Sequence, residues 1–468
     1  MKLLSRWTVL VLTLGIVAGC GERARQAVEA GHYVIVTRSP AGEAGLHPEP
    51  SQRLVSGSQL AALDLDAASE PRELSQGLNA AGSPSITIDG RQIIFIAREK
   101  ESDPFSLFSS ALDGSNRQRL VGEPYNCGGG AELPDGRIVF SATVEDAVPP
   151  SHFTSAWGLF VLSPESGEIQ RITFSGHTEI DPQVLSDGRV LYSQWLPGGD
   201  GRSDTGSFAL FTVHPDGTGA APIHGQHGGP EWKLRPRQAD SGDLFFVAAQ
   251  SAGLSAISGT LWAAPDQNGF SLALPPALPL TVEPATGDRF LVATLPASQD
   301  EGGLLVVDRE GRVLDRVQSG DPTWAIIDAV EVRSRRRPQG QLSMIDPAGD
   351  RGLLLAIDAR PAGPLGRRAA TARLRLASSA ARRPRILGDL PLAADGSFFA
   401  TVPANEPLLL DILDAEGNVL VETVSPIWVR PKEVRNCIGC HEDPETAPPN
   451  RRPLAVLEAP VDLVAEES

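Results

Sequence analysis

The chain has 468 residues, of which 41% are hydrophobic, enough to build folded cores and too many for wholesale disorder. A chain of this length is longer than a domain with one hydrophobic core usually is, so two or three domains are expected. Asp and Glu outnumber Lys and Arg by 58 to 41, giving a net charge of −17. This balance argues against nucleic acid as a partner, because such binding depends on a basic face that neutralises phosphates.

The N-terminus has the pattern of a bacterial export signal. Two basic residues precede an apolar run at residues 7–17, which is too short to span a bilayer. The run leads into Val-Ala-Gly-Cys, which resembles a lipobox, so we expect a lipoprotein signal peptide over 1–19, lipidation of Cys20 and a linker over 20–29. The chain would then be anchored in the cell envelope and face the periplasm. No Asp follows the Cys, which favours the outer membrane. An ordinary signal peptide with a chance Cys is the alternative.

Repeated short strands with Asp-Gly turns fill the next part of the chain. The pattern of strand, Asp-Gly and strand occurs at residues 85–95, 133–140 and 185–192, and each copy is followed by a second pair of strands. Asp-Gly supplies the positive φ angles of a tight hairpin. Four strands in about fifty residues form one propeller blade. The sequence therefore predicts an all-β fold with a propeller of about six blades, of the TolB or WD40 type, over 30–325. Unrelated hairpins in a sandwich are the alternative.

Alternating strands continue beyond the propeller in an Arg-rich segment. Between residues 333 and 385 the chain has 13 Arg, three Asp and no Glu. We expect a small β-sandwich-like domain over 326–432. The Arg side chains are expected on the solvated faces of its strands. The alternative is a cationic flank for an acidic partner or for the carboxylates of a cofactor.

The chemistry of the chain is concentrated in Cys437-Ile438-Gly439-Cys440-His441, which fits the attachment motif of a c-type haem. Two thiols at this spacing reach the two vinyl groups of the porphyrin as thioethers, and the adjacent His becomes the proximal iron ligand. We therefore expect one covalent haem c on Cys437, Cys440 and His441, in a segment over 433–468 that ends in a Pro-rich tail. A disulfide, a redox-active dithiol and a zinc knuckle are the alternatives.

The sixth ligand of the iron is left open by the sequence. Candidates are Met344, one of two Met in the chain, and the closely spaced His224 and His227. An open sixth position would let the iron bind a small ligand, whereas a side-chain ligand indicates an electron carrier. Cys127 is the remaining thiol and is expected to be a small buried core residue; a binding site at a Gly-rich blade entrance is the alternative.

Several stretches of the sequence resemble proteins related to the hydrazine synthase alpha subunit. They lie at residues 133–140, 395–398, 402–405, 413–417, 428–431, 437–442 and 448–453. The resemblance implies a propeller followed by a middle domain that binds haem c. The sequence has no second Cys-x-x-Cys-His and ends 27 residues after His441. We therefore do not expect hydrazine synthesis itself, and whether the protein is an enzyme stays open.

Together these patterns predict a lipid-anchored monohaem cytochrome on a propeller scaffold. Its expected role is electron transfer or redox sensing in the periplasm, with a redox partner protein. One alternative is a haem enzyme that acts on a small nitrogen or oxygen species at a five-coordinate iron. The other is a TolB-like propeller interaction module in which the haem is accessory. No Gly-x-Ser-x-Gly elbow and no phosphate-binding Gly-rich loop with Lys occurs.

Overall fold

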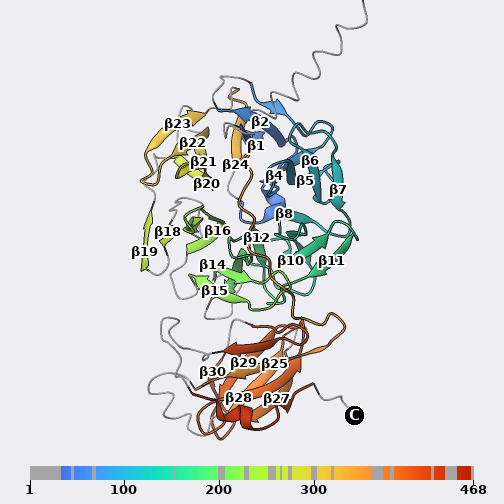
Figure 1. Cartoon of the computed structure of the whole chain (residues 1–468), viewed down its shortest axis with the longest axis vertical. Coiled ribbons are helices and arrows are strands. Elements are labelled where there is room, and N and C mark those ends of the chain that lie inside the picture. Colours follow the sequence, from blue (N-terminus) through green and yellow to red (C-terminus); the bar gives the residue numbers. More distant parts are fainter. Residues whose placement is uncertain are drawn as a thin grey trace, which may run out of the picture. The chain divides into compact units, whose positions relative to one another are not determined.

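The fold is all-β, as predicted (Figure 1). The computed structural model describes residues 33–43, 47–65, 70–151, 153–198, 206–225, 231–250, 260–263, 266–271, 277–296, 303–317, 321–360, 373–379, 384–422, 426–437 and 451–464. Within these ranges the only helices are two short 3-10 turns, η1 (Pro50–Gln52) and η2 (Leu454–Leu457). No described helix is long and apolar enough to cross a bilayer. The predicted export signal and Cys20 lie outside these ranges.

Six four-stranded sheets form the predicted propeller. The first contains β24 (Trp324–Glu331), β1 (Tyr33–Pro40), β2 (Gln59–Asp64) and β3 (Arg72–Glu73). The second contains β4 (Ala80–Ile86), β5 (Gln92–Arg98), β6 (Ser106–Ala111) and β7 (Gln118–Val121). The third contains β8 (Cys127–Glu132), β9 (Ile138–Val144), β10 (Ala156–Ser163) and β11 (Glu168–Arg171).

The remaining three blades have the same meander of antiparallel strands. The fourth contains β12 (Glu179–Val184), β13 (Val190–Pro197), β14 (Gly206–Val213) and β15 (Ala221–His224). The fifth contains β16 (Glu231–Gln238), β17 (Leu244–Gln250), β18 (Thr260–Ala263) and β19 (Asp266–Ser271). The sixth contains β20 (Ala277–Ala285), β21 (Arg289–Pro296), β22 (Gly303–Val307) and β23 (Val313–Val317).

The first blade joins the two ends of the repeat region. β24 pairs antiparallel with β1, with Val34 opposite Glu331 and Ala329 opposite Val36. This strand runs to Glu331, beyond the boundary expected at residue 325. Its sequence is one more apolar strand with no break in composition, so only its long-range pairing assigns it to the propeller.

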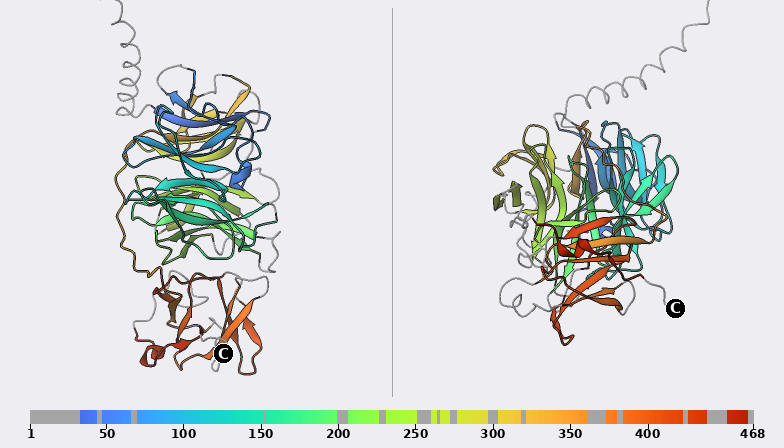
Figure 2. Two further views of the ribbon diagram at one scale, coloured as in Figure 1. Left: turned by 90° about the vertical axis from the view of Figure 1, so that its right-hand side faces the viewer. Right: turned by 60° about the horizontal axis from the view of Figure 1, so that its bottom comes forward.

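A small sandwich follows, drawn in orange and red in Figures 1 and 2. One sheet has the order β31-β25-β28-β32, with β31 (Val434–Cys437), β25 (Arg351–Ala356), β28 (Phe398–Pro403) and β32 (Val461–Asp462). The other has the order β27-β26-β29-β30, with β27 (Arg385–Pro391), β26 (Arg373–Ser378), β29 (Leu408–Leu413) and β30 (Val419–Val421). Alternate residues of these strands, such as Leu354, Leu374 and Leu410, form one buried core.

The described residues divide into two compact units. The first comprises 1–134, 234–249 and 253–337, and the second comprises 135–233, 250–252 and 338–468. The first unit holds its own cores, around Ile35 and Phe95 in one cluster and Val34 and Leu291 in another. The second unit holds the sandwich core together with strands β9 to β15.

The Asp-Gly turns recognised in the sequence have a second role in each unit. Gly90 and Gly188 have positive φ, as tight hairpins require. The chain between β24 and β25, residues 332–350, which we call the strap, passes over these turns: Arg335 donates its N–H to the carbonyl of Ile88 at 2.9 Å in the first unit. In the second unit a Cβ at Gly188 would collide with the carbonyl oxygen of Gln339. Glycine is thus required for the hairpin and for the close approach of this strap.

Many arginines of the segment 333–385 are ion-paired. Arg351 pairs with Asp462, Arg360 with Asp358, Arg375 with Asp389 and Arg385 with Glu406. Arg335 and Arg337 instead donate to the carbonyls of Ile86 and Pro134. These residues therefore serve the packing of the sandwich and of the strap rather than forming an unpaired cationic face.

Candidate functional site

Cys437 is the part of the predicted haem motif that the structure describes; Cys440 and His441 lie outside the described residues. It ends β31, the edge strand that pairs in parallel with β25, and lies opposite Ala356. The N–H of Ile357 donates to the carbonyl of Cys437 at 3.0 Å. Its side chain is half-buried and packs against the apolar core of the sandwich. The thiol therefore lies at a sheet edge, beside an apolar wall.

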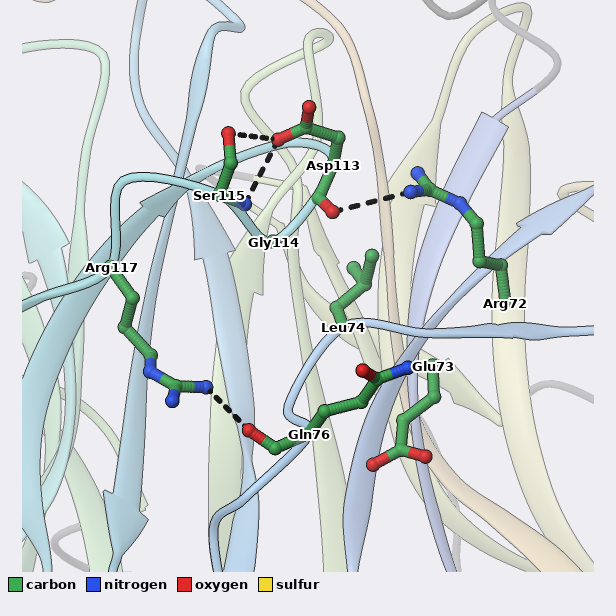
Figure 3. A pocket seen from close by; sticks show the side chains of 8 residues that line it. All are labelled: Arg72, Glu73, Leu74, Gln76, Asp113, Gly114, Ser115 and Arg117. Atoms are coloured by element: carbon green, nitrogen blue, oxygen red, sulfur yellow. Dashed lines mark hydrogen bonds between the residues drawn. The ribbon is translucent and has the colours of Figure 1, made fainter. Parts of the chain in front are cut away.

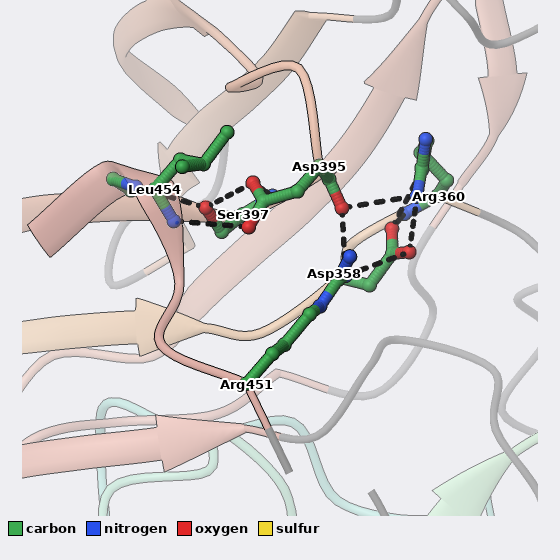
Figure 4. A network of polar contacts seen from close by, with 7 residues as sticks. Asp358, Arg360, Asp395, Ser397, Arg451 and Leu454 are labelled. Carbon is green, nitrogen blue, oxygen red and sulfur yellow. Dashed lines mark hydrogen bonds and ion pairs between the residues drawn. The ribbon is translucent and has the colours of Figure 1, made fainter. Parts of the chain in front are cut away.

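The chain returns to the same domain at residue 451, where a set of polar contacts holds it (Figure 4). Asp395 accepts a hydrogen bond from the N–H of Leu454 at 2.9 Å through its carboxylate and one from Arg451 Nη2 at 2.9 Å through its carbonyl. Ser397 Oγ accepts from the N–H of Ala455 at 3.0 Å. We call Asp395, Ser397 and Arg451 the clasp. Burial opposes ionisation of Asp395, but hydrogen bonds from Ser397 and Leu454 hold its pKa below the ordinary value.

An ion pair next to the clasp links it to the turn that contacts Cys437. Asp358 follows Ile357 in the chain and receives two hydrogen bonds from Arg360, at 2.8 Å to Oδ1 and 2.6 Å to Oδ2. Arg451 Nη2 lies 3.6 Å from Asp358 Oδ2. The residues on either side of 438–450, Cys437 and Arg451, therefore both contact the first turn after β25.

The chain before Cys437 is fixed to a turn of the fourth blade, in the same compact unit. Trp428 Nε1 donates to the carbonyl of Gly217 at 3.1 Å, and Arg430 Nε donates to that of Asp216 at 2.8 Å. Arg435 Nη2 donates to the carbonyl of Ala220 at 2.6 Å. We call residues 428–435 the anchor. Three side chains of the segment before the predicted haem motif thus donate hydrogen bonds to backbone carbonyls of one Asp-Gly turn.

Glu433 and Arg430 complete the anchor. Glu433 accepts the N–H of Gly219 at 3.0 Å through Oε1 and the N–H of Arg430 at 2.6 Å through Oε2. The Arg430 residue is 2% exposed, its guanidinium lies 5.0 Å from the ring centroid of Phe174, and its Nη1 donates to Asn405. Burial lowers the pKa of Arg430 to about 10, partly opposed by the charges of Asp216 and Glu433. A buried guanidinium with this many acceptors holds a fixed orientation.

The predicted sixth-ligand candidates lie elsewhere on the second unit. Met344 is 78% exposed, on the strap, and its N–H donates to Asp216 Oδ2 at 3.3 Å. His224 ends β15 and is half-buried; burial and the charge of Lys233 lower its pKa. His227 lies outside the described residues. Within the described ranges no group of three or more His, Cys, Asp or Glu is placed to hold a metal ion. The identity of the sixth ligand stays a prediction.

Two further features of the first unit have structural rather than chemical roles. Cys127 is fully buried in β8, and burial raises the pKa of its thiol to about 12, so a reactive thiolate is unfavourable.

Figure 3 shows an open pocket between β3 and the β6–β7 hairpin. Its polar groups hold the two hairpins together, since Arg72 donates to the carbonyl of Asp113 at 3.2 Å and Arg117 to that of Gln76 at 3.1 Å.

The sequence indicated only part of this site. It identified Cys437 and the stretch at 428–431, but gave no role to Glu433, Arg435 or the turn at 216–220. A side chain that donates to a distant backbone carbonyl leaves no local pattern in the sequence. The one available signal for the turn was its Asp-Gly pair, which also occurs at Gly136, where a Cβ on the glycine would meet nothing within 4 Å.

Comparison with known proteins agrees with the predicted resemblance. Residues 354–442 match the family model of the hydrazine synthase alpha subunit middle domain. The fold is similar to Kuenenia stuttgartiensis hydrazine synthase, with a TM-score of 0.79 and 18% identity over 91% of this chain and 71% of that chain. It is less similar to TolB from Acinetobacter baumannii, with a TM-score of 0.44 and 15% identity over 60% of this chain and 62% of that chain. No curated protein sequence gives a significant match.

Proposed function

We propose that this chain, which is related to the hydrazine synthase alpha subunit through its middle domain, is an exported monohaem c-type cytochrome. Cys437 and Cys440 would hold the haem as thioethers, with His441 as the proximal iron ligand. The observation that carries this proposal is the position of the motif: it closes the matched region 354–442, and its first thiol lies at the end of an anchored edge strand. Lipidation of Cys20 would hold the protein in the cell envelope, facing the periplasm.

The described residues fit a planar apolar cofactor. Cys437 offers a half-buried thiol at a sheet edge, beside the apolar core of the sandwich. The anchor fixes the backbone before the motif, and the clasp fixes the backbone after it. A bound haem supplies a one-electron couple of its iron.

Electron transfer or redox sensing with a partner protein is the role we propose for this single site. The sequence has one Cys-x-x-Cys-His, so hydrazine synthesis itself is not part of the proposal. A haem enzyme acting on a small nitrogen or oxygen species at a five-coordinate iron is the second candidate, since the sequence does not fix a sixth ligand. An interaction module with an accessory haem is the third.

The test is covalent haem in the purified, exported protein. Cells that attach haem c should yield a chain that keeps its haem on a denaturing gel and gives the pyridine haemochrome spectrum of haem c. Cys437→Ala with Cys440→Ala should abolish both signals, while Cys127→Ala, which removes a buried thiol in another unit, should keep them. Covalent haem that survives the double substitution would refute the proposal.

Carbon monoxide separates the two leading roles. A reduced protein that does not bind carbon monoxide has both axial positions of the iron filled by side chains and fits an electron carrier. Rapid carbon monoxide binding shows an open iron position and favours the haem enzyme. Replacing Met344 or His224 with Ala then shows whether either side chain closes that position.

A further inference from the structure

The first part of the strap, residues 333–337, connects separate blades within the first unit. Arg333 donates to both carboxylate oxygens of Asp240, in the turn between β16 and β17, at 2.8 and 3.2 Å. Two residues later, the N–H of Arg335 donates to the carbonyl of Ile88, in the turn between β4 and β5, at 2.9 Å. The fifth and second blades, which do not follow each other in the chain, are therefore tied to one segment of three residues.

The same segment also reaches the third blade. Arg337 Nη1 donates to the carbonyl of Pro134, which lies between β8 and β9, at 2.8 Å. Between these contacts the backbone lies against the turn of the second blade, because a Cβ on Gly90 would be 2.7 Å from the amide nitrogen of Ser334. The segment thus packs on one turn and reaches two other blades with its arginines.

The segment and the turns that it contacts are chemically opposite. Each hydrogen bond that residues 333–337 make to the blades comes from a guanidinium or a backbone N–H, which are donors only. The receiving groups are acceptors only, namely the carboxylate of Asp240 and the carbonyls of Ile86, Ile88 and Pro134. A cationic cover suits such a face, and the five residues of the segment are four Arg and one Ser.

Polar contacts alone hold this segment in place, whereas the blades that it contacts have apolar cores. It contains no apolar side chain, and three of its five residues are exposed. In the second blade, Ile93 and Phe95 are buried in a cluster that also holds Val332, the residue before the segment. Regions with few buried apolar contacts open locally at a lower free energy than core strands do. The segment should therefore open before the hairpins that it covers.

We propose that residues 333–337 form a lid, held closed by the ion pairs and hydrogen bonds of its arginines, which opens as one segment while the blade turns under it stay folded. Val332 is fully buried and fixes one end of the lid. In the closed state Arg333 is shared between Asp240 and Glu331, with its Nε 3.0 Å from Glu331 Oε2. Opening leaves the acceptors of the turns to solvent, and no covalent bond changes. The lid does not depend on the proposed haem, and either can be absent without the other.

Hydrogen–deuterium exchange of the full-length protein, resolved to single amides by mass spectrometry, tests the lid. Two amides report on the two parts: that of Arg335 bonds to Ile88 across the lid, and that of Thr87 bonds to Gln92 within the hairpin at 3.0 Å. Relative to its intrinsic rate, the Arg335 amide should exchange on the order of tenfold faster than the Thr87 amide. Equal or slower exchange at Arg335 would overturn the proposal, because the segment would then open only together with the hairpin.

A pair of variants on the segment separates a lid from a support of the blade. Arg335→Gln removes the charged donor to the carbonyl of Ile86 and should speed exchange at residue 335 on the order of tenfold, with the Thr87 amide unchanged. Arg336→Gln, an exposed change on the same segment, is the matched control and should alter neither rate. Equal acceleration at residues 335 and 87 in Arg335→Gln would overturn the proposal, because Arg335 would then hold the blade itself.

Salt provides a measurement that does not depend on a variant folding. In the ion pair between Arg333 and Asp240 the side chains are 21% and 72% exposed, so salt should screen it. In the unsubstituted protein, about 1 M salt should speed exchange of the Arg335 amide about two- to fivefold relative to that of Thr87. A ratio of the two rates that salt leaves unchanged would overturn a lid held closed by ion pairs.

Discussion

The chain on the two sides of residues 438–450 is held in different ways. At the anchor, Trp428 and Arg430 are each 2% exposed, and they donate to backbone carbonyls of a blade turn. At the clasp, the Arg451 side chain is 37% exposed, and Asp395 makes its bonds close to solvent. Hydrogen bonds from a buried charge are worth more than exposed ion pairs, and leaving a partner buried and unsatisfied costs most of all. The strand before Cys437 should therefore be the rigid end, and the chain after residue 450 the looser one.

The largest expected effect comes from the buried guanidinium of the anchor. Arg430→Met keeps the length of the side chain but leaves the carbonyl of Asp216 and the carboxylate of Glu433 without their cationic neighbour. Removing one partner of a buried charged set costs about 3–5 kcal/mol. Urea unfolding followed by tryptophan fluorescence should show this loss. Arg336→Met, on an exposed position of the strap, is the control and should change stability by less than about 0.5 kcal/mol. Equal losses of unfolding free energy in the two variants would show that the buried Arg430 contributes no more to stability than an exposed residue.

The Asp-Gly turn that accepts hydrogen bonds from the anchor can be compared with another Asp-Gly turn through a matched pair of glycine substitutions. Gly217 and Gly136 occupy the same place in their Asp-Gly turns, with φ of 87° and 88°. A Cβ at Gly217 would lie 2.8 Å from Arg430 Nε and would also meet the carbonyl of Ile172, whereas at Gly136 nothing lies within 4 Å. Both Ala substitutions carry the strain of positive φ, but only Gly217→Ala also displaces the anchor, adding about 1–3 kcal/mol.

Differential scanning calorimetry of Gly217→Ala and Gly136→Ala measures that difference directly. The haem-loaded Gly217→Ala protein should in addition become more accessible to protease between residues 438 and 450. A Gly136→Ala variant as unstable as Gly217→Ala would mean that backbone strain alone explains the effect and that docking of the anchor adds nothing.

The contrast between the two ends also shows what could be predicted from the sequence. Repeated Asp-Gly turns at 89–90 and 187–188 predicted the blades, because turn chemistry and strand alternation are local properties. The pairing of β24 with β1 was not predicted, because the two strands are about 300 residues apart and each is simply apolar. Cys437 was found by its motif, whereas Glu433 and Arg435 act through contacts with residues that are distant in sequence, and such contacts leave no local pattern.

The clasp should show a moderate, pH-dependent effect. The folded-state pKa of Asp395 is depressed, so its contribution to stability is fully present above the unfolded-state value, about 3.9, and is lost as pH falls through the folded value. Asp395→Asn removes this contribution and should cost about 1 kcal/mol at pH 7, with the difference from the unsubstituted protein shrinking in acid. Thermal unfolding at a series of pH values checks both statements. Glu416→Gln, an exposed change in the same domain, is the control. A difference that grows in acid would contradict the assigned sign.

The smallest effect is expected for the exposed cation of the clasp. Arg451 lies 3.6 Å from Asp358, which already has Arg360 as a closer partner, and its remaining bond is to one backbone carbonyl. Such exposed pairs contribute about 0–1 kcal/mol, and salt screens them. Arg451→Ala should therefore change the unfolding free energy by less than Asp395→Asn, and the change should shrink further in about 1 M salt. If Arg451→Ala instead destabilised the protein as strongly as Arg430→Met, both ends of the segment would be rigid, and the proposed asymmetry between anchor and clasp would be wrong.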